Sequence, residues 1–85
     1  MAEISRFYGI IISMFGSEHN PPHFHIKYGH YKALYTIKNG VIKGEIPISV
    51  LKKVNDWVEI HKEELIQNWD LLQSGGNVNK VEPLK

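Results

Sequence analysis

The chain of 85 residues contains no cysteine. Disulfide bonds, thiol redox chemistry and thiolate metal sites are therefore excluded, and a metal would have to be bound by histidine, aspartate or glutamate. Charge of one sign is also scarce, because 10 lysine and arginine residues nearly balance 9 aspartate and glutamate residues and leave a net charge of +1. A phosphate-bearing partner would consequently need a local cluster of cationic donors, since the whole chain exerts little attraction.

Long apolar runs are missing as well. The apolar start, residues 7–15, is short and is interrupted by Gly9 and Ser13, so we expect neither a signal peptide nor a membrane-spanning segment. We expect a cytoplasmic protein without a membrane partner. Hydrophobic residues make up 42% of the chain and charged residues 22%, which is typical of a folded globular domain and excludes intrinsic disorder.

The chain has the length of one small domain, which we place at residues 1–74, followed by a flexible C-terminal tail at residues 75–85. Its first half predicts strands. Residues 7–15 are almost continuously apolar and indicate one buried central strand, and two alternating segments and a return strand follow. These three lie at residues 23–28, 31–37 and 41–46, and the last two are joined by an Asn-Gly turn.

Residues 48–74 carry apolar side chains at helical spacing. A straight helix of this length would measure about 40 Å, which exceeds the roughly 30 Å expected across such a domain. We therefore expect a kink or break near His61 and Lys62. The fold class is α+β, with a small antiparallel sheet of three to four strands packed on one face against this C-terminal helical segment.

The segment SEHNPPHFHIKYG, residues 17–29, holds three of the five histidines around a Pro-Pro pair. His23 and His25 are two positions apart on a predicted strand, so their rings should project from one face, about 7 Å apart. The prolines stiffen the loop that carries His19. We expect Phe24 and its alternating partners to face the helix, which leaves His23, His25 and Lys27 accessible to solvent.

Two kinds of chemistry suit this segment. In a metal site, His19, His23 and His25 would bind Zn²⁺ or another divalent metal, and Glu18 would be a fourth ligand, an outer partner or a base. In a metal-free site, two of the histidines, His23 and His25, would act as general base and acid on RNA, and Lys27 or Arg6 would stabilise the phosphate. The remaining alternative is that the histidines only line a polar sheet face. The candidate binding residues are His19, Asn20, Lys27, Arg6 and Glu18.

Other notable side chains have structural interpretations. His30 lies at a predicted turn and should be solvated. His61 falls on the apolar helix stripe, where we expect a core histidine that is hydrogen-bonded to a backbone carbonyl. Trp57 and Trp69 indicate either core packing or a subunit interface.

Four segments together resemble the family catalogued as domain of unknown function 4160. They are ISRFYGIIISMF, EHNPPHFHIKYG, YKALYTI and HKEELIQNW, and the run HNPPHFH, residues 19–25, is the hallmark. The resemblance extends over nearly the whole chain. It implies a small prokaryotic protein of a kind that is often encoded beside another small protein, in what is sometimes described as a toxin–antitoxin-like pair. The resemblance does not assign a catalytic role to any residue.

The leading hypothesis is a small module that uses its histidine-rich surface to bind a phosphate-bearing or protein partner, RNA included. The alternatives are a metal-free ribonuclease, a metal-dependent hydrolase with a cofactor such as zinc, and a structural homo-oligomeric protein with the helix tryptophans at a dimer interface. Whether the chain is an enzyme is left open at this point.

Overall fold

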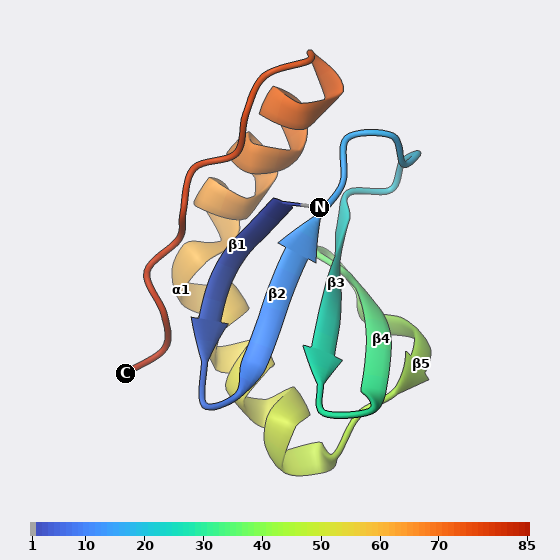
Figure 1. Cartoon of the computed structure of the whole chain (residues 1–85), viewed down its shortest axis with the longest axis vertical. Helices are drawn as coiled ribbons and strands as arrows, with labels where there is room; N and C mark the ends of the chain where they lie inside the picture. Colours follow the sequence, from blue (N-terminus) through green and yellow to red (C-terminus); the bar gives the residue numbers. More distant parts are fainter. Residues whose placement is uncertain (1) are drawn as a thin grey trace.

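The computed structural model describes residues 2–85, with the side chains of all except Ala2, Val41 and Ile42. Five antiparallel strands form one sheet in chain order, and a long helix packs on one face of it (Figure 1). The α+β class is confirmed, with one strand more than expected. The elements are β1 (Ala2–Phe7), β2 (Ile10–Met14), β3 (His23–Tyr28), β4 (Tyr31–Thr36), β5 (Gly40–Glu45) and α1 (Ile48–Gln73).

The apolar segment 7–15 does not form a single strand, so that prediction is wrong. Tyr8 and Gly9 have φ angles of 51° and 76° and make a two-residue turn between β1 and β2. Such a turn requires left-handed backbone at both central positions, which glycine adopts without cost. The apolar pattern continues across the turn because both flanking strands send side chains into the core.

The core lies between the inner face of the sheet and α1. The Trp57 ring of α1 packs against Phe7 and Phe24, with ring centroids 5.3 and 5.8 Å apart, so Phe24 faces the helix as expected. Trp57 and Trp69 are 0% and 2% exposed. Both tryptophans are therefore core residues, which is the first of the two predicted alternatives, and they are not available for a subunit interface.

The long helix α1 is kinked near its middle, as expected. His61 has non-helical backbone angles, φ −115° and ψ 19°. Its Nδ1 lies 2.8 Å from Oε1 of Glu64, so the His61 side chain is hydrogen-bonded to a carboxylate and not to a backbone carbonyl. Within residues 2–85, no helix combines the length and the apolar character that a membrane crossing requires.

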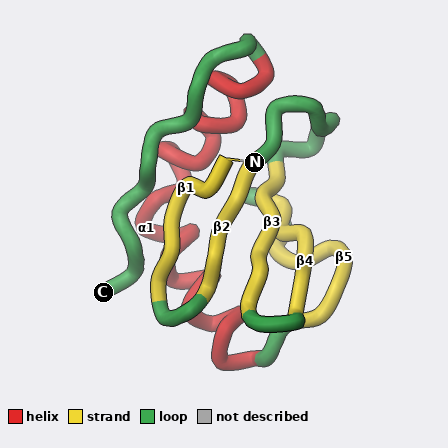
Figure 2. Tube along the Cα trace, viewed as in Figure 1, coloured by secondary structure: helices red, strands yellow, loops and turns green. Residues whose placement is uncertain are grey.

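The C-terminal tail, residues 75–85, turns back and runs beside α1 and β1 (Figure 2). The amide of Val81 donates to the carbonyl of Ile4 at 2.8 Å, and the Val81 side chain is buried. Asn68, also buried, bonds both the amide and the carbonyl of Asn79. The tail is thus packed on the domain, although it contains few apolar residues. Its flexibility stays a prediction.

Candidate functional site

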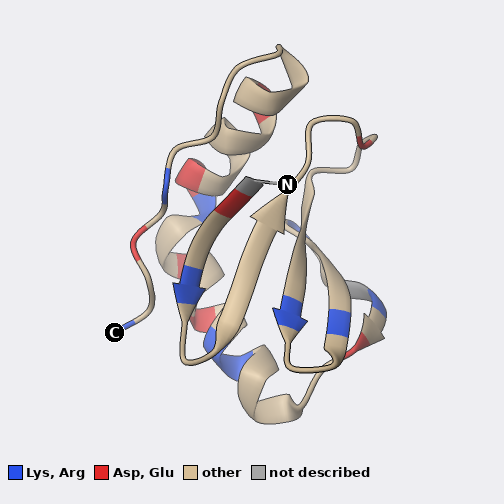
Figure 3. Ribbon diagram, viewed as in Figure 1, with Lys and Arg blue, Asp and Glu red and all other residues tan. Residues whose placement is uncertain are grey.

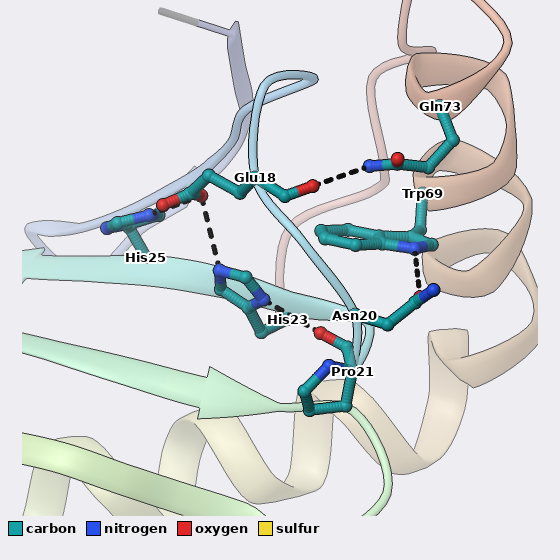
Figure 4. A network of polar contacts seen from close by, with 7 residues as sticks. All are labelled: Glu18, Asn20, Pro21, His23, His25, Trp69 and Gln73. Atoms are coloured by element: carbon teal, nitrogen blue, oxygen red, sulfur yellow. Dashed lines mark hydrogen bonds and ion pairs between the residues drawn. The ribbon is translucent and has the colours of Figure 1, made fainter.

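The loop between β2 and β3 brings the side chain of Glu18 against the first residues of β3 (Figure 4). Oε1 of Glu18 lies 2.7 Å from Nε2 of His25 and 3.2 Å from Nε2 of His23. One candidate ligand atom from each of these residues lies within 4.8 Å of the other two. We refer to these three residues as the Glu18–His23–His25 cluster.

The last turns of α1 hold this loop in place. The indole Nε1 of Trp69 donates to Oδ1 of Asn20 at 3.2 Å, and Nε2 of Gln73 donates to the backbone carbonyl of Glu18 at 3.1 Å (Figure 4). Asn20, a candidate binding residue, therefore has a structural partner. One contact holds the Asn20 side chain and the other holds the Glu18 backbone, so the loop is tied to α1 on both sides of His19.

His23 is not accessible, so that prediction is wrong. Only 9% of the residue is exposed, its ring packs against Trp69 with centroids 5.1 Å apart, and its Nδ1 lies 2.8 Å from the carbonyl oxygen of Pro21. The cause is tertiary, because the end of α1 and the loop close over the start of β3. Alternation along one strand cannot reveal such a cover.

His25 lies one step further along β3 and keeps contact with solvent. Its side chain is 34% exposed, and its ring meets Phe15 edge-on, with centroids 4.7 Å apart and an interplanar angle of 89°. The ring is therefore oriented by Phe15 and Glu18 together. Of the two histidines on β3, only His25 combines a fixed orientation with substantial access.

The other candidate residues lie outside the cluster. His19 is exposed, and among residues 2–85 the His, Asp and Glu side chains that converge as a possible metal site are those of Glu18, His23 and His25. The sequence identified Glu18 as a supporting group, but in the structure it takes the central place. Lys27 is exposed on the sheet, and Arg6 is paired with Glu3 at 2.8 Å.

The strand register places two rows of side chains on the sheet face that is turned away from α1. One row crosses all five strands at Arg6, Ile11, Lys27, Lys32 and Glu45. The next row consists of Glu3, Ser13, His25, Leu34 and Lys43. We call the surface formed by these ten residues the outer face, and His25 belongs both to it and to the cluster.

An open groove of about 580 Å³ runs over the outer face. Ile11, Phe15 and Leu34 contribute apolar lining, and the charged lining residues are Glu3, Arg6, Lys27, Lys32 and Lys43. Figure 3 shows Lys and Arg positions on β1, β3, β4 and β5, and acidic positions on β1 and β5. Lys32 and Lys43 are not among the residues predicted from the sequence, because only the strand register shows that Lys32 shares a row with Lys27 and Lys43 shares a row with His25.

Arg6 differs from the three lysines in its electrostatic state. Its guanidinium hydrogen-bonds both carboxylate oxygens of Glu3, and this bond lowers the pKa of Glu3 below its ordinary value. The pair therefore stays ionised at neutral pH, and the two charges largely compensate each other. No ion pair within residues 2–85 involves Lys27, Lys32 or Lys43.

The fold and these side chains define a small α+β domain in which a carboxylate–histidine cluster adjoins a cationic sheet face. The sequence model of a family described as a domain of unknown function, DUF4160, matches residues 9–70, and the chain belongs to this family. The matched range contains the whole cluster and Lys27, Lys32 and Lys43. No curated protein and no solved structure matches the chain significantly.

Proposed function

We propose that the chain binds single-stranded RNA across its outer face. One observation carries this proposal: Lys27, Lys32 and Lys43 come from the three neighbouring strands β3, β4 and β5 and line the same groove. Phosphate groups supply most of the affinity of nucleic acids for proteins, and cations gathered on one face provide the local field that a net charge of +1 cannot.

The arrangement of the lysines supports an anionic ligand. Lys27 and Lys32 are direct cross-strand partners. Like charges that face each other across an antiparallel pair repel and destabilise the sheet. A phosphate between the two ammonium groups would remove this repulsion, so the bound state gains an interaction that the free domain lacks.

The floor of the groove supports a single strand in preference to a duplex. Ile11 and Leu34 are partly exposed between the cations, and Phe15 lies at the groove wall. Unpaired bases can contact such apolar surface while their phosphates reach the lysines, which is the usual combination in proteins that bind single strands. In a duplex the bases are stacked and paired inside, so only the phosphates would be in contact.

The test measures binding of a fluorescently labelled oligouridylate by anisotropy. The Lys27→Ala/Lys32→Ala double variant should bind at least about tenfold more weakly at low salt. The matched control is Lys52→Ala/Lys62→Ala, which removes two exposed charges from α1 and should bind like the native chain. Equal losses in both double variants, or no binding by the native protein, would refute the proposal.

The salt dependence gives a second measurement on the same samples. For single strands the slope of log K against log salt concentration is about −0.7 for each phosphate contact, so three lysines predict a slope of about −2. Removal of Lys27 and Lys32 should bring it to about −0.7. An unchanged slope would mean that the lysines do not contact phosphate.

Cleavage of the bound strand is a second candidate function, and the position of His25 favours it. His25 lines the groove, and its Nε2 is hydrogen-bonded to Glu18, an arrangement that suits a general base. His23 and His25 cannot both act on a bound strand as the predicted acid and base pair, because His23 is buried and bonded to Pro21. The geometry therefore favours RNA binding over the metal-free ribonuclease hypothesis.

The proposal includes a biological setting that rests on the family resemblance. We place the chain as the RNA-binding member of a toxin–antitoxin-like pair in the prokaryotic cytoplasm, with a small protein or a second copy as partner. Copurification of the chain with the product of the neighbouring gene, tested with and without ribonuclease, examines this part separately. Loss of the partner on ribonuclease treatment would show that RNA alone connects the two proteins.

A further inference from the structure

We propose that Glu18, His23 and His25 form a binding site for one Zn²⁺ ion. Two imidazole nitrogens and one carboxylate oxygen are a known zinc ligand set, which leaves a fourth position for water or a substrate. The three residues come from one loop and one strand, and their ligand atoms already converge. This inference concerns the cluster and is independent of RNA binding by the lysines.

The tautomer of His23 is the strongest argument. Its Nδ1 lies 2.8 Å from the carbonyl oxygen of Pro21, and because a carbonyl only accepts, Nδ1 must carry a hydrogen. In the neutral ring Nε2 then carries a lone pair, and this atom lies 3.2 Å from Oε1 of Glu18. Two electron-rich atoms at this distance repel each other unless a metal ion or a proton lies between them.

The two distances from Glu18 to the imidazole nitrogens are close to those of a zinc site, and the ligand atoms of all three residues lie within 4.8 Å of one another. With metal–ligand distances of about 2.0–2.1 Å, the ligand atoms of a tetrahedral site are roughly 3.3 Å apart. The distance from Glu18 to His23 is 3.2 Å, and that from Glu18 to His25 is 2.7 Å. A shift of the Glu18 side chain by about half an ångström, which its three rotatable bonds allow, would bring both distances to this value.

The surroundings hold the ligands in position before an ion arrives. A backbone carbonyl on the second nitrogen of a histidine is the usual outer partner in metal sites, and Pro21 supplies it to His23. Phe15 orients the ring of His25, and Gln73 holds the backbone of Glu18. The Glu18 and His25 side chains are 30% and 34% exposed, so an ion can enter from solvent.

The ligand types select the class of metal. Imidazole suits zinc and its neighbours among the transition metals, whereas Mg²⁺ and Ca²⁺ prefer sites built from oxygen atoms. A second explanation of the contact is a protonated His23 that donates to Glu18 without any metal. The two explanations differ in whether Zn²⁺ binds, which can be measured directly.

The test is isothermal titration of the chelator-stripped chain with ZnCl₂, with MgCl₂ as the comparison metal. We expect one Zn²⁺ per chain, no heat from Mg²⁺, and a loss of Zn²⁺ affinity of at least about a hundredfold in both His25→Ala and Glu18→Gln. His19→Ala is the matched control, because His19 is exposed next to the cluster, and it should bind like the native chain.

Two outcomes would overturn the inference. One is a native chain that binds no Zn²⁺, and the other is a His25→Ala variant that binds it as tightly as His19→Ala does. Circular dichroism must show that each variant is folded. Zinc-induced shifts of the His23 and His25 imidazole resonances, with those of His19 and His30 unmoved, provide a readout in the native chain that needs no variant.

Discussion

Lys27 of β3 and Lys32 of β4 are direct cross-strand partners on the outer face. Because like charges in this position repel, Lys27→Glu should turn the pair into an attractive one and raise the free energy of unfolding by about 0.2–1 kcal/mol. The same substitution should weaken RNA binding. Urea denaturation measures the gain, which should shrink in high salt as the charges are screened. A variant that is less stable than the native chain at low salt would contradict this explanation.

The tail should contribute measurably to stability through Asn68. This buried side chain bonds both backbone groups of Asn79, so Asn68→Ala leaves two tail groups without their partner. We expect a loss of about 1–3 kcal/mol in the free energy of unfolding and faster proteolysis after residue 74. Gln67→Ala, at the exposed neighbouring position, is the control. If both variants unfold alike, the tail contacts do not stabilise the domain.

Gly44 of β5 has a close packing requirement that tests the β4–β5 pairing. Its φ angle is +91°, and an added Cβ would collide with the carbonyl oxygen of Lys32 and stand 2.9 Å from Cα of Ala33. Gly29 has a φ angle of +58° with nothing within 4 Å of such a Cβ. Gly44→Ala should therefore cost about 2 kcal/mol or more, and Gly29→Ala clearly less. Equal thermal shifts would argue against the close approach of β4 and β5.

Local patterns in the sequence predicted the α+β class, the strand at residues 23–28 and the kink at His61, because each depends on periodicity or helix length within a short segment. They failed where distant segments decide the outcome. The burial of His23 depends on Trp69 of α1, and the packing of the tail depends on Asn68. Lys27, Lys32 and Lys43 lie on one surface because of the register between their strands. The sequence of a single strand does not determine this register.

In the candidate site, too, local sequence patterns predict some features, and contacts between distant segments determine the others. The two-residue spacing of His23 and His25 predicts that their rings lie close together, and the ring centroids are 5.8 Å apart. The exclusion of His19 and the central place of Glu18 depend on how the end of α1 holds the loop. Trp69 contacts Asn20 across 49 positions of the chain, and Gln73 contacts Glu18 across 55 positions. Contacts at such separations leave no periodic signal in a sequence.

The last prediction concerns alkaline pH and Tyr35. This tyrosine is 5% exposed, and its hydroxyl donates to Oδ1 of Asn55. Burial, with a smaller contribution from Glu59, raises the pKa of Tyr35 above its ordinary value of 10.0. The folded state therefore holds this proton more tightly than the unfolded state does. The resulting stability is fully present below pH 10.0 and is lost as the pH rises through the raised pKa.

Tyr35→Phe should separate this effect from the other groups that titrate at alkaline pH. At neutral pH the variant should be less stable than the native chain by about 1 kcal/mol, because it lacks the hydrogen bond to Asn55. As the pH rises above 10.0, the free energies of unfolding of the native chain and of Tyr35→Phe should approach each other, since the variant has no proton to lose at this position. Tyr8→Phe, at a residue that is 57% exposed, is the control for the removal of a tyrosine hydroxyl. Urea midpoints measured from neutral to alkaline pH check this, and a Tyr35→Phe curve that stays parallel to the native one would show that the titration of Tyr35 is not linked to folding.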